Sequence, residues 1–402
     1  MTSPIETIRG LIQDYIDHGD IPEKEESLAQ ETFQRILAQL SSLSLQQRWS
    51  VIRKVKASQH TEKKTALKKS ISGTTSKWKD VLLGVDHFLQ LNVHHHPLTY
   101  SNSLDHPISF DGRFSLFAGS EVAGIVGSTF ATNKPERLDD KGHQILDAIY
   151  ASSCSSGYAL ALGDGAGGHF GEPTQDHKIA RASHFGTKSC VRFLSAYDKP
   201  KQLREDLLDL IELVGEEIND KALCEGTTLV ACRAFPQGKN YWITGVNIGD
   251  SMLVGWDPIS KTVYHLLPSR ATEAGTAIIP TAYRPFEVHT INDIVPAGTI
   301  LFLMSDGVHD ELPYEEKEET YPNKLTYRTR SLRTLETILG DIPPDAPVDI
   351  FLRKIIDATL DSIEQKRKKA VEAGERTQIG DDVSIVGCRL PYVEGSEKCT
   401  IN

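Results

Sequence analysis

Four short apolar segments in the middle of the chain constrain its fold more than any other feature. They are rich in β-branched and aromatic residues, as strands are, and they cover 227–235, 241–248, 252–256 and 262–267. Turn-forming pairs such as Gln237-Gly238 and Asp257-Pro258 separate them. Strands that follow one another with only turns between them form a meander, so we expect an antiparallel sheet.

Further strands and helices surround this meander. Strand-like segments come earlier at 122–132 and 158–162, and later at 299–304 and 383–388. Apolar residues at a spacing of three to four indicate one helix from 203 to 218 and another from 348 to 363. Because strands and helices do not alternate strictly, a doubly wound parallel sheet is disfavoured. We expect an α+β fold with helices packed outside antiparallel sheets.

The N-terminal region has a different character. Apolar residues in 1–80 recur at helical spacing, and the charges there are 13 Lys and Arg against 10 Asp and Glu. The remainder has a net charge of -14, which would repel nucleic acid phosphates, so no nucleic acid partner is expected. We predict a helical, partly basic extension over 1–110, one large domain over 111–392 and a flexible tail over 393–402.

Most of the excess basic residues lie in Arg48–Lys79, which holds ten of them and one acid. Such a run is either a solvated face or a contact for an acidic partner or an anionic membrane surface. The six cysteines have no regular spacing, and the acidic N-terminus lacks the pattern of a signal peptide. A cytoplasmic protein with reduced thiols is therefore expected.

Acidic residues meet glycine near the ends of several predicted strands. The clusters are Asp164-Gly165, Gly249-Asp250-Ser251, Ser305-Asp306-Gly307 and Gly380-Asp381-Asp382, and Asp139-Asp140 lies nearby without glycine. An aspartate at a strand end can aim its carboxylate at a point shared with others, and hard divalent cations prefer such oxygen ligands. Each cluster alone is better explained as a turn.

The order of these clusters resembles that of the PP2C (PPM) family of metal-dependent Ser/Thr phosphatases. The family's Asp-Gly-His-Gly-Gly is similar to Asp164-Gly165-Ala166-Gly167-Gly168, and its Gly-Ser/Thr-Thr to Gly226-Thr227-Thr228. Its Gly-Asp-Ser-Arg is similar to Gly249-Asp250-Ser251-Met252. The element with Pro-Gly, an apolar strand and Ser-Asp-Gly is similar to 296–308, and the closing motif to Asp381-Asp382-Val383-Ser384. The resemblance covers about 121–390.

The resemblance implies an αββα sandwich of two antiparallel sheets with a binuclear Mg²⁺ or Mn²⁺ site at one end. Asp164 would bridge both cations and the Gly165 carbonyl would bind one. Asp306 and Asp381 would hold the other cation. Asp250 and Asp310 stand where the family can bind a third, weaker cation.

The resemblance also implies single-step hydrolysis of a phosphoserine or phosphothreonine in a phosphoprotein. Asp139, with Asp140 as the alternative, would orient metal-bound water. Two cations about 3.5–4 Å apart would lower the pKa of bridging water and clamp the phosphoryl oxygens.

Three positions depart from the family pattern. The signature His is Ala166, and His169 is either its substitute as general acid or a polar surface residue. Lys134 takes the place of the phosphate-binding Arg, or Arg137 is displaced into that role, and Lys lacks the bidentate fork of Arg. Met252 replaces the last Arg. These losses motivate an alternative, a catalytically weak or inactive PP2C-like module that binds a phosphoprotein or partner.

The chain ends in Cys399-Thr400-Ile401-Asn402. This approximates a prenylation signal, although Thr and a terminal Asn are not its usual residues and chance is the better explanation. A prenylated Cys399 would give peripheral membrane association, with the Arg48–Lys79 stretch as the second signal that stable anchoring requires. Such a tail would suit a bacterial effector inside a eukaryotic host.

Overall fold

A computed structural model describes part of the chain. The described residues are 100–101, 116–118, 124–131, 146–154, 157–165, 173–196, 203, 207–208, 210–211, 214–215, 226–272, 279, 288–320, 326–374 and 381–392. The predictions for 1–80, for Arg48–Lys79 and for the tail with Cys399 lie outside these residues. The described strands form two six-stranded sheets and one three-stranded sheet.

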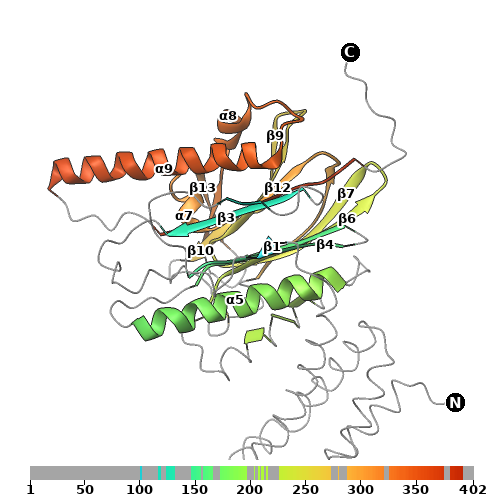
Figure 1. Ribbon diagram of the computed structural model, residues 1–402, viewed down its shortest axis with the longest axis horizontal. Helices are drawn as coiled ribbons and strands as arrows, with labels where there is room; N and C mark the ends of the chain where they lie inside the picture. Colours follow the sequence, from blue (N-terminus) through green and yellow to red (C-terminus); the bar gives the residue numbers. More distant parts are fainter. Residues whose placement is uncertain are drawn as a thin grey trace, which may run out of the picture. The chain divides into compact units, whose positions relative to one another are not determined.

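The first six-stranded sheet contains the first two strands of the predicted meander, and the other two belong to the second sheet. Its strands, in spatial order, are β1 (Tyr100–Ser101), β4 (Ala148–Cys154), β5 (Gly157–Gly163), β6 (Leu229–Gln237), β7 (Asn240–Ile248) and β11 (His289–Pro296). Each neighbouring pair is antiparallel. Helix α5 (Pro173–Ala196) packs against β4, β5 and β6 on the outer face of this sheet (Figure 1).

The second six-stranded sheet faces the first. Its strands, in spatial order, are β2 (Leu116–Ala118), β3 (Ile125–Ala131), β15 (Asp382–Arg389), β12 (Ile300–Met304), β8 (Met252–Asp257) and β9 (Thr262–Leu267), again all antiparallel. Helix α9 (Val348–Ala373) lies across its outer face, with the short α8 (Leu335–Leu339) beside it (Figure 1). Strand β12 leads directly into the four-residue helix α7 (Asp306–His309).

Strand β12 is apolar along its whole length because both of its faces are buried. Leu301 and Leu303 belong to the core between the two sheets, together with Leu160 of β5. The alternate residues Ile300, Phe302 and Met304 belong to a second core, under α9. Because successive side chains of a strand point to opposite faces, a strand buried on both faces has no polar side.

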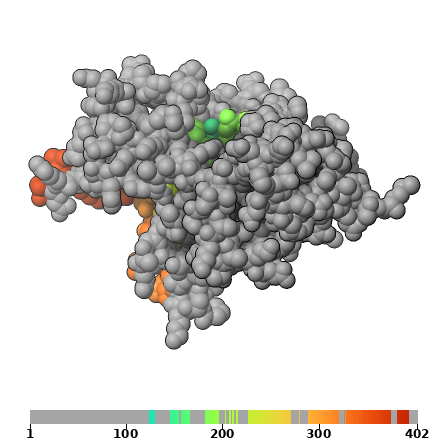
Figure 2. All heavy atoms as spheres, turned by 90° about the horizontal axis from the view of Figure 1, so that it is seen from below, coloured from blue at the N-terminus to red at the C-terminus, as the bar shows by residue number. Residues whose placement is uncertain are grey.

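The three-stranded sheet consists of β10 (Ser269–Thr272), β14 (Thr326–Ser331) and β13 (Glu315–Thr320), in that order. The sequence did not predict it. Every side chain of β13 is exposed, so the strand lacks the apolar alternation by which strands are recognised. In the view of Figure 2, atoms in the orange of this part of the chain lie at the surface.

The predicted α+β sandwich of two antiparallel sheets flanked by helices is confirmed. Strand β9 has the predicted bounds, and α9 begins at the predicted Val348. In the predicted helix after α5, the described residues 203, 207–208, 210–211 and 214–215 are helical. Strand β1 pairs with β4 although it lies inside the range predicted for the extension. The domain boundaries at 110 and 392 stay predictions.

Two expectations concern the surroundings of the protein. None of the described helices is long and apolar enough to cross a bilayer. The four described cysteines, Cys154, Cys190, Cys232 and Cys388, are free thiols, as their irregular spacing predicts.

Candidate metal centre

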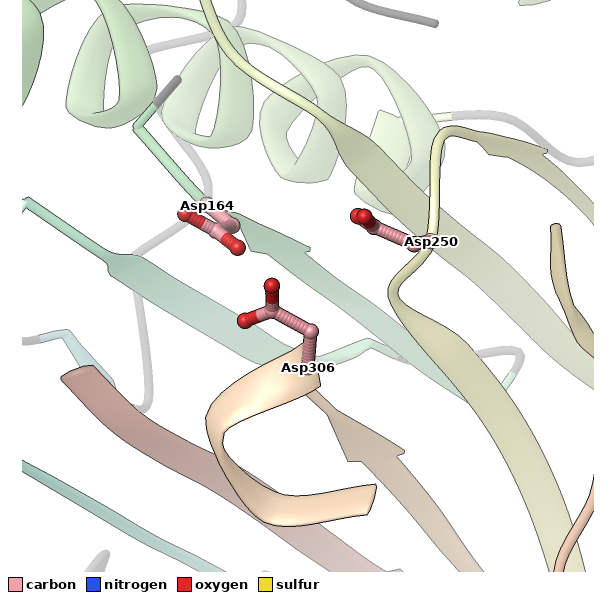
Figure 3. A group of neighbouring side chains, drawn as sticks. All are labelled: Asp164, Asp250 and Asp306. Carbon is pink, nitrogen blue, oxygen red and sulfur yellow. The ribbon is translucent and has the colours of Figure 1, made fainter. Parts of the chain in front are cut away.

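Three aspartates from separate strand ends meet at one end of the sandwich. Asp164 follows β5, Asp250 lies between β7 and β8, and Asp306 follows β12. One carboxylate oxygen from each lies within 4.8 Å of those from the other two. Figure 3 shows the three carboxylates turned toward one another. Both sheets therefore contribute to the cluster.

The backbone of Asp164 is held by two threonines. The Thr228 N–H donates to the Asp164 carbonyl at 2.8 Å, and the Thr227 hydroxyl donates to the same carbonyl at 2.9 Å. The Asp164 N–H in turn donates to Thr228 Oγ1 at 3.1 Å. The preceding Gly163 leaves no room for a side chain, because a Cβ there would lie 2.4 Å from Thr187 Oγ1. The Gly-Thr-Thr motif thus fixes the position of the first aspartate.

Asp306 is placed by the contact between the ends of β12 and β15. The Ser305 N–H donates to the Ser384 carbonyl at 2.9 Å, and the Ser384 N–H donates to Ser305 Oγ at 3.0 Å. Gly307 allows α7 to approach this end, since a Cβ on it would lie 2.1 Å from the Asp382 carbonyl oxygen. The glycine of Ser-Asp-Gly is therefore required by close packing between α7 and β15.

A fourth acidic residue, which the sequence did not single out, lies next to this group. Asp147 is 1% exposed and directly precedes β4. Ala148 pairs with Gly163, so Asp147 stands beside the strand end that carries Asp164. Asp147 has no neighbouring glycine, so it does not share the motif of the other aspartates. It could have been predicted only from its position before a strand that pairs with β5.

Mutual repulsion shapes the electrostatics of the centre. Burial raises the pKa of Asp164 well above its usual value, and the charges of Asp147, Asp381 and Asp250 raise it further. The pKa of Asp306 is raised in the same way, by burial first and then by Asp164, Asp250 and Asp381. Burial also raises the pKa of Asp147. Carboxylates held this close favour a cation that offsets their charge.

The donor set fits a hard divalent cation. All three residues of the cluster offer carboxylate oxygens, which Mg²⁺ and Mn²⁺ prefer over nitrogen or sulfur. The Oδ1 atom of Asp306 is buried and has no hydrogen-bond partner among the described residues. A buried carboxylate oxygen without a donor is costly, and a bound cation would compensate it.

Two further predicted ligands lie close by. Asp381 precedes β15, and its charge acts on both Asp164 and Asp306. Its Oδ1 accepts a hydrogen bond from the Asp382 N–H at 2.8 Å. Gly165 directly follows Asp164, and a β-bridge with Thr227 holds its backbone in place.

Asp310 lies outside the three-aspartate cluster. Its Oδ1 lies 2.9 Å from Nδ1 of His309 and accepts a hydrogen bond from Arg330. Burial acts to raise the pKa of Asp310, but His309 and Arg330 outweigh it and lower the pKa. His309, which the sequence did not single out, is fully buried between Asp310 and the Asp250 backbone.

The remaining predicted site residues lie outside the described part of the chain. They are Asp139, Asp140, Lys134, Arg137 and His169.

Comparison with known proteins gives matches among solved structures only. No protein-family model matches the chain, and no curated protein sequence matches it. The matching structures include several described as bacterial serine or serine/threonine phosphatases. The serine/threonine phosphatase Stp1 from Staphylococcus aureus is 15% identical with a TM-score of 0.42, and the match covers 67% of this chain and 95% of that one.

Two other matches have similar identity and coverage. The serine/threonine phosphatase PstP/Ppp of Mycobacterium tuberculosis is 17% identical with a TM-score of 0.41, covering 67% of this chain and 98% of that one. PppA of Pseudomonas aeruginosa, a key regulatory component of T6SS, is 13% identical with a TM-score of 0.39, covering 66% and 97%. Likenesses this low say nothing of this chain's chemistry, for which the side chains of the site are the evidence.

Proposed function

We propose that this protein is a Mg²⁺- or Mn²⁺-dependent phosphatase that hydrolyses phosphoserine and phosphothreonine in proteins. The observation that carries this function is the meeting of Asp164, Asp250 and Asp306 within 4.8 Å of one another. Their motifs are the same ones whose order in the sequence resembles PP2C phosphatases. The geometry and the sequence pattern therefore support one another at the same residues.

The aspartates are the groups that would hold the cations. Asp164 and Asp306 face each other from the two sheets, and the charge of Asp381 acts on both. We propose these three as the main ligand set, as the sequence resemblance implies. Asp250 and the Gly165 carbonyl complete it. Asp147 adds a buried negative charge to the same group. Bound cations would supply activated water and a clamp on the phosphoryl oxygens.

The proposed reaction transfers the phosphoryl group of the substrate to water. Hydrolysis forms a bond from water oxygen to phosphorus, breaks the bond from phosphorus to the side-chain oxygen, and leaves a water proton on the released alcohol. Carboxylates alone would repel a phosphate, so the site requires positive charge before a phosphomonoester can enter. Lys134 or Arg137 is our proposal for the basic residue that grips the phosphate, and His169 for the proton donor to the leaving oxygen.

The remaining expectations stand as proposals. Asp139 or Asp140 would orient the attacking water, two cations would bind with a third more weakly, and 111–392 would form the catalytic domain. The extension would target or regulate it through Arg48–Lys79. A phosphoprotein is the substrate that the sequence resemblance implies.

Hydrolysis assays with a matched pair of variants test this function. We would measure turnover of an aryl phosphate and of a phosphoserine peptide with Mn²⁺, with chelator, and in Asp164→Asn and Asp361→Asn. Asp361 is an exposed aspartate of α9 and serves as the control. We expect metal-dependent turnover that Asp164→Asn reduces about 100-fold or more, because it removes a charge that would bind a cation, while Asp361→Asn leaves it unchanged.

Two outcomes separate the enzyme from the non-catalytic alternative. Turnover that persists in chelator, or in Asp164→Asn, contradicts the metal-dependent mechanism. Mn²⁺ binding without turnover of either substrate would instead favour the PP2C-like binding module.

A further inference from the structure

The loop that carries Asp250 is held at three successive carbonyls by three different parts of the chain. The Arg270 N–H of β10 donates to the Gly249 carbonyl at 3.3 Å, and Nε2 of His309 donates to the Asp250 carbonyl at 2.6 Å. Asn247 Nδ2 donates to the Ser251 carbonyl at 2.6 Å. Gly249 has a φ of +105°, a conformation that other residues rarely adopt.

The contact from His309 is the central one of the three. A carbonyl oxygen accepts hydrogen bonds only, so Nε2 of His309 carries the hydrogen. The side chain is fully buried, and its other ring nitrogen lies 2.9 Å from Asp310 Oδ1. The ring is therefore held between the Asp250 backbone on one side and the Asp310 carboxylate on the other.

Asp310 connects this ring to the three-stranded sheet. Its carboxylate accepts a hydrogen bond from Arg330 of β14, and its carbonyl oxygen lies 3.3 Å from Lys366 Nζ of α9. The Arg330 guanidinium also lies 4.8 Å from the centre of the Tyr314 ring and 3.8 Å from a carboxylate oxygen of Glu316. A continuous path of contacts thus leads from β14 to the aspartate of the candidate metal centre.

We propose, on the premise that the function proposed above holds, that His309 is a positioning residue for the cation ligand Asp250. Through Asp310 and Arg330 it couples the three-stranded sheet to the affinity of the centre for a cation. The sheet acts on the same loop a second time, through Arg270 of β10. Residues that orient a ligand change metal affinity about 10- to 100-fold when they are replaced.

The chain offers a matched control for the sheet end of this path. Arg328 and Arg330 lie two residues apart on β14 and therefore on the same face. Each has its Nε 3.8 Å from a glutamate of β13, Glu318 for Arg328 and Glu316 for Arg330. Arg330 also contacts Asp310 and lies over the Tyr314 ring. A difference between Arg330→Gln and Arg328→Gln therefore reports these extra contacts.

The experiment measures Mn²⁺ affinity by titration calorimetry in the full chain, with hydrogen exchange of 247–253 in the metal-free protein as a second readout. We expect Arg330→Gln to weaken Mn²⁺ binding several-fold and to speed exchange in this loop, while Arg328→Gln changes neither. His309→Leu should weaken binding about 10-fold. Because the buried leucine could impair folding, His309→Gln, which can still donate to the Asp250 carbonyl, should recover part of the affinity.

The possible results are distinct. Equal effects of Arg330→Gln and Arg328→Gln, or no effect of either on both readouts, overturn the coupling. If the wild-type protein binds no Mn²⁺, the proposed function fails, and the exchange comparison alone decides whether the sheet positions the Asp250 loop. Faster exchange in Arg330→Gln only would then still support that link.

Discussion

Two regions of this protein gather acidic side chains, but the repulsion between their carboxylates is offset only in the second of them. In the candidate metal centre, aspartates from different strand ends face one another, and burial and mutual repulsion raise the pKa of Asp164 and Asp306. On β13, four glutamates lie in the exposed strand 315–320, and Arg270, Arg328, Arg330 and Arg333 stand within ion-pair distance of them.

The two regions differ in how far the repulsion between carboxylates destabilises the folded state. The glutamates of β13 are offset by arginines and by water, so they hold a strand in place without an apolar face. The aspartates of the centre are held by backbone contacts that bring like charges together. A fold that keeps such a cluster stores repulsion that a bound cation would relieve.

The largest expected effect is on the packing that brings the carboxylates together. Gly307→Ala places a Cβ 2.1 Å from the Asp382 carbonyl oxygen, so α7 and β15 must separate. We expect a loss of about 3 kcal/mol in the free energy of unfolding, measured by urea denaturation. Gly374→Ala is the control, because a Cβ there meets open space and only its φ of +70° is strained, at a cost of about 1 kcal/mol. Equal losses would show that the close contact is not present.

Cation binding should stabilise the protein to a similar degree. Mn²⁺ at about 100 times its dissociation constant adds about 2.7 kcal/mol to the folded state, which we expect to see as a higher melting temperature that chelator reverses. Glutamates already paired with arginines offer no comparable site, so Glu318→Gln should leave the shift unchanged. A shift that is equally large in Asp306→Asn would place the stabilising cation elsewhere.

Removing one charge from the centre should stabilise the metal-free protein. The raised pKa of Asp306 means that its ionised form is disfavoured in the folded state. Asp306→Asn should therefore raise the free energy of unfolding in chelator at pH 7 by about 1 kcal/mol, measured as a higher melting temperature. The same replacement should abolish the gain from Mn²⁺. A lower melting temperature in chelator would mean that repulsion does not dominate at this position.

A histidine at the start of β11, His289, should produce a smaller, pH-dependent effect. Burial, and then the charge of Arg270, lower the pKa of His289 to about 4. The unfolded chain therefore binds a proton here more readily than the folded one, so stability from this group is complete above pH 6.5 and is lost as the pH falls toward 4. His289→Gln should reduce this acid loss by about 1 kcal/mol, measured as the change in melting temperature between pH 7 and pH 4.5. An unchanged acid loss would contradict the burial of a neutral His289.

The smallest effect is expected on β13 itself. Arg328 and Glu318 are both largely exposed and their charged atoms are 3.8 Å apart. Glu318→Gln should therefore change the free energy of unfolding by less than about 0.5 kcal/mol, measured by urea denaturation at low and high salt. A larger, salt-sensitive loss in the free energy of unfolding would mean that charge pairs on β13 matter to stability as much as the charges of the metal centre do.

The parts of the fold that were predictable are those whose residues carry a local signal. Strands β9 and β12 and the start of helix α9 are apolar at the right spacing, so these bounds could be predicted closely. Helix α9 continues to Ala373, past the predicted end at 363, through a segment rich in charged residues. Strand β13 has the sequence EEKEET, which has no apolar alternation. It could not be predicted, because its structure depends on pairing with β14 and not on a pattern within the strand itself.

The same distinction applies to the candidate site. Asp164, Asp250 and Asp306 each stand next to a glycine and a strand end, which made them recognisable. Asp147 has only a strand after it, and His309 has no motif at all. Their importance depends on the register of β4 with β5 and on the contact between α7 and the Asp250 loop. Such contacts join residues far apart in the chain, and no local pattern reports them.

The central claim is that the facing aspartates form a cation site, and direct Mn²⁺ binding tests it most simply. Titration calorimetry on the full chain should show saturable Mn²⁺ binding that competes with Mg²⁺ and is lost or strongly weakened in Asp306→Asn, while Asp361→Asn binds as the wild type does. Absence of binding in the wild-type protein, or equal binding by Asp306→Asn, would contradict the account.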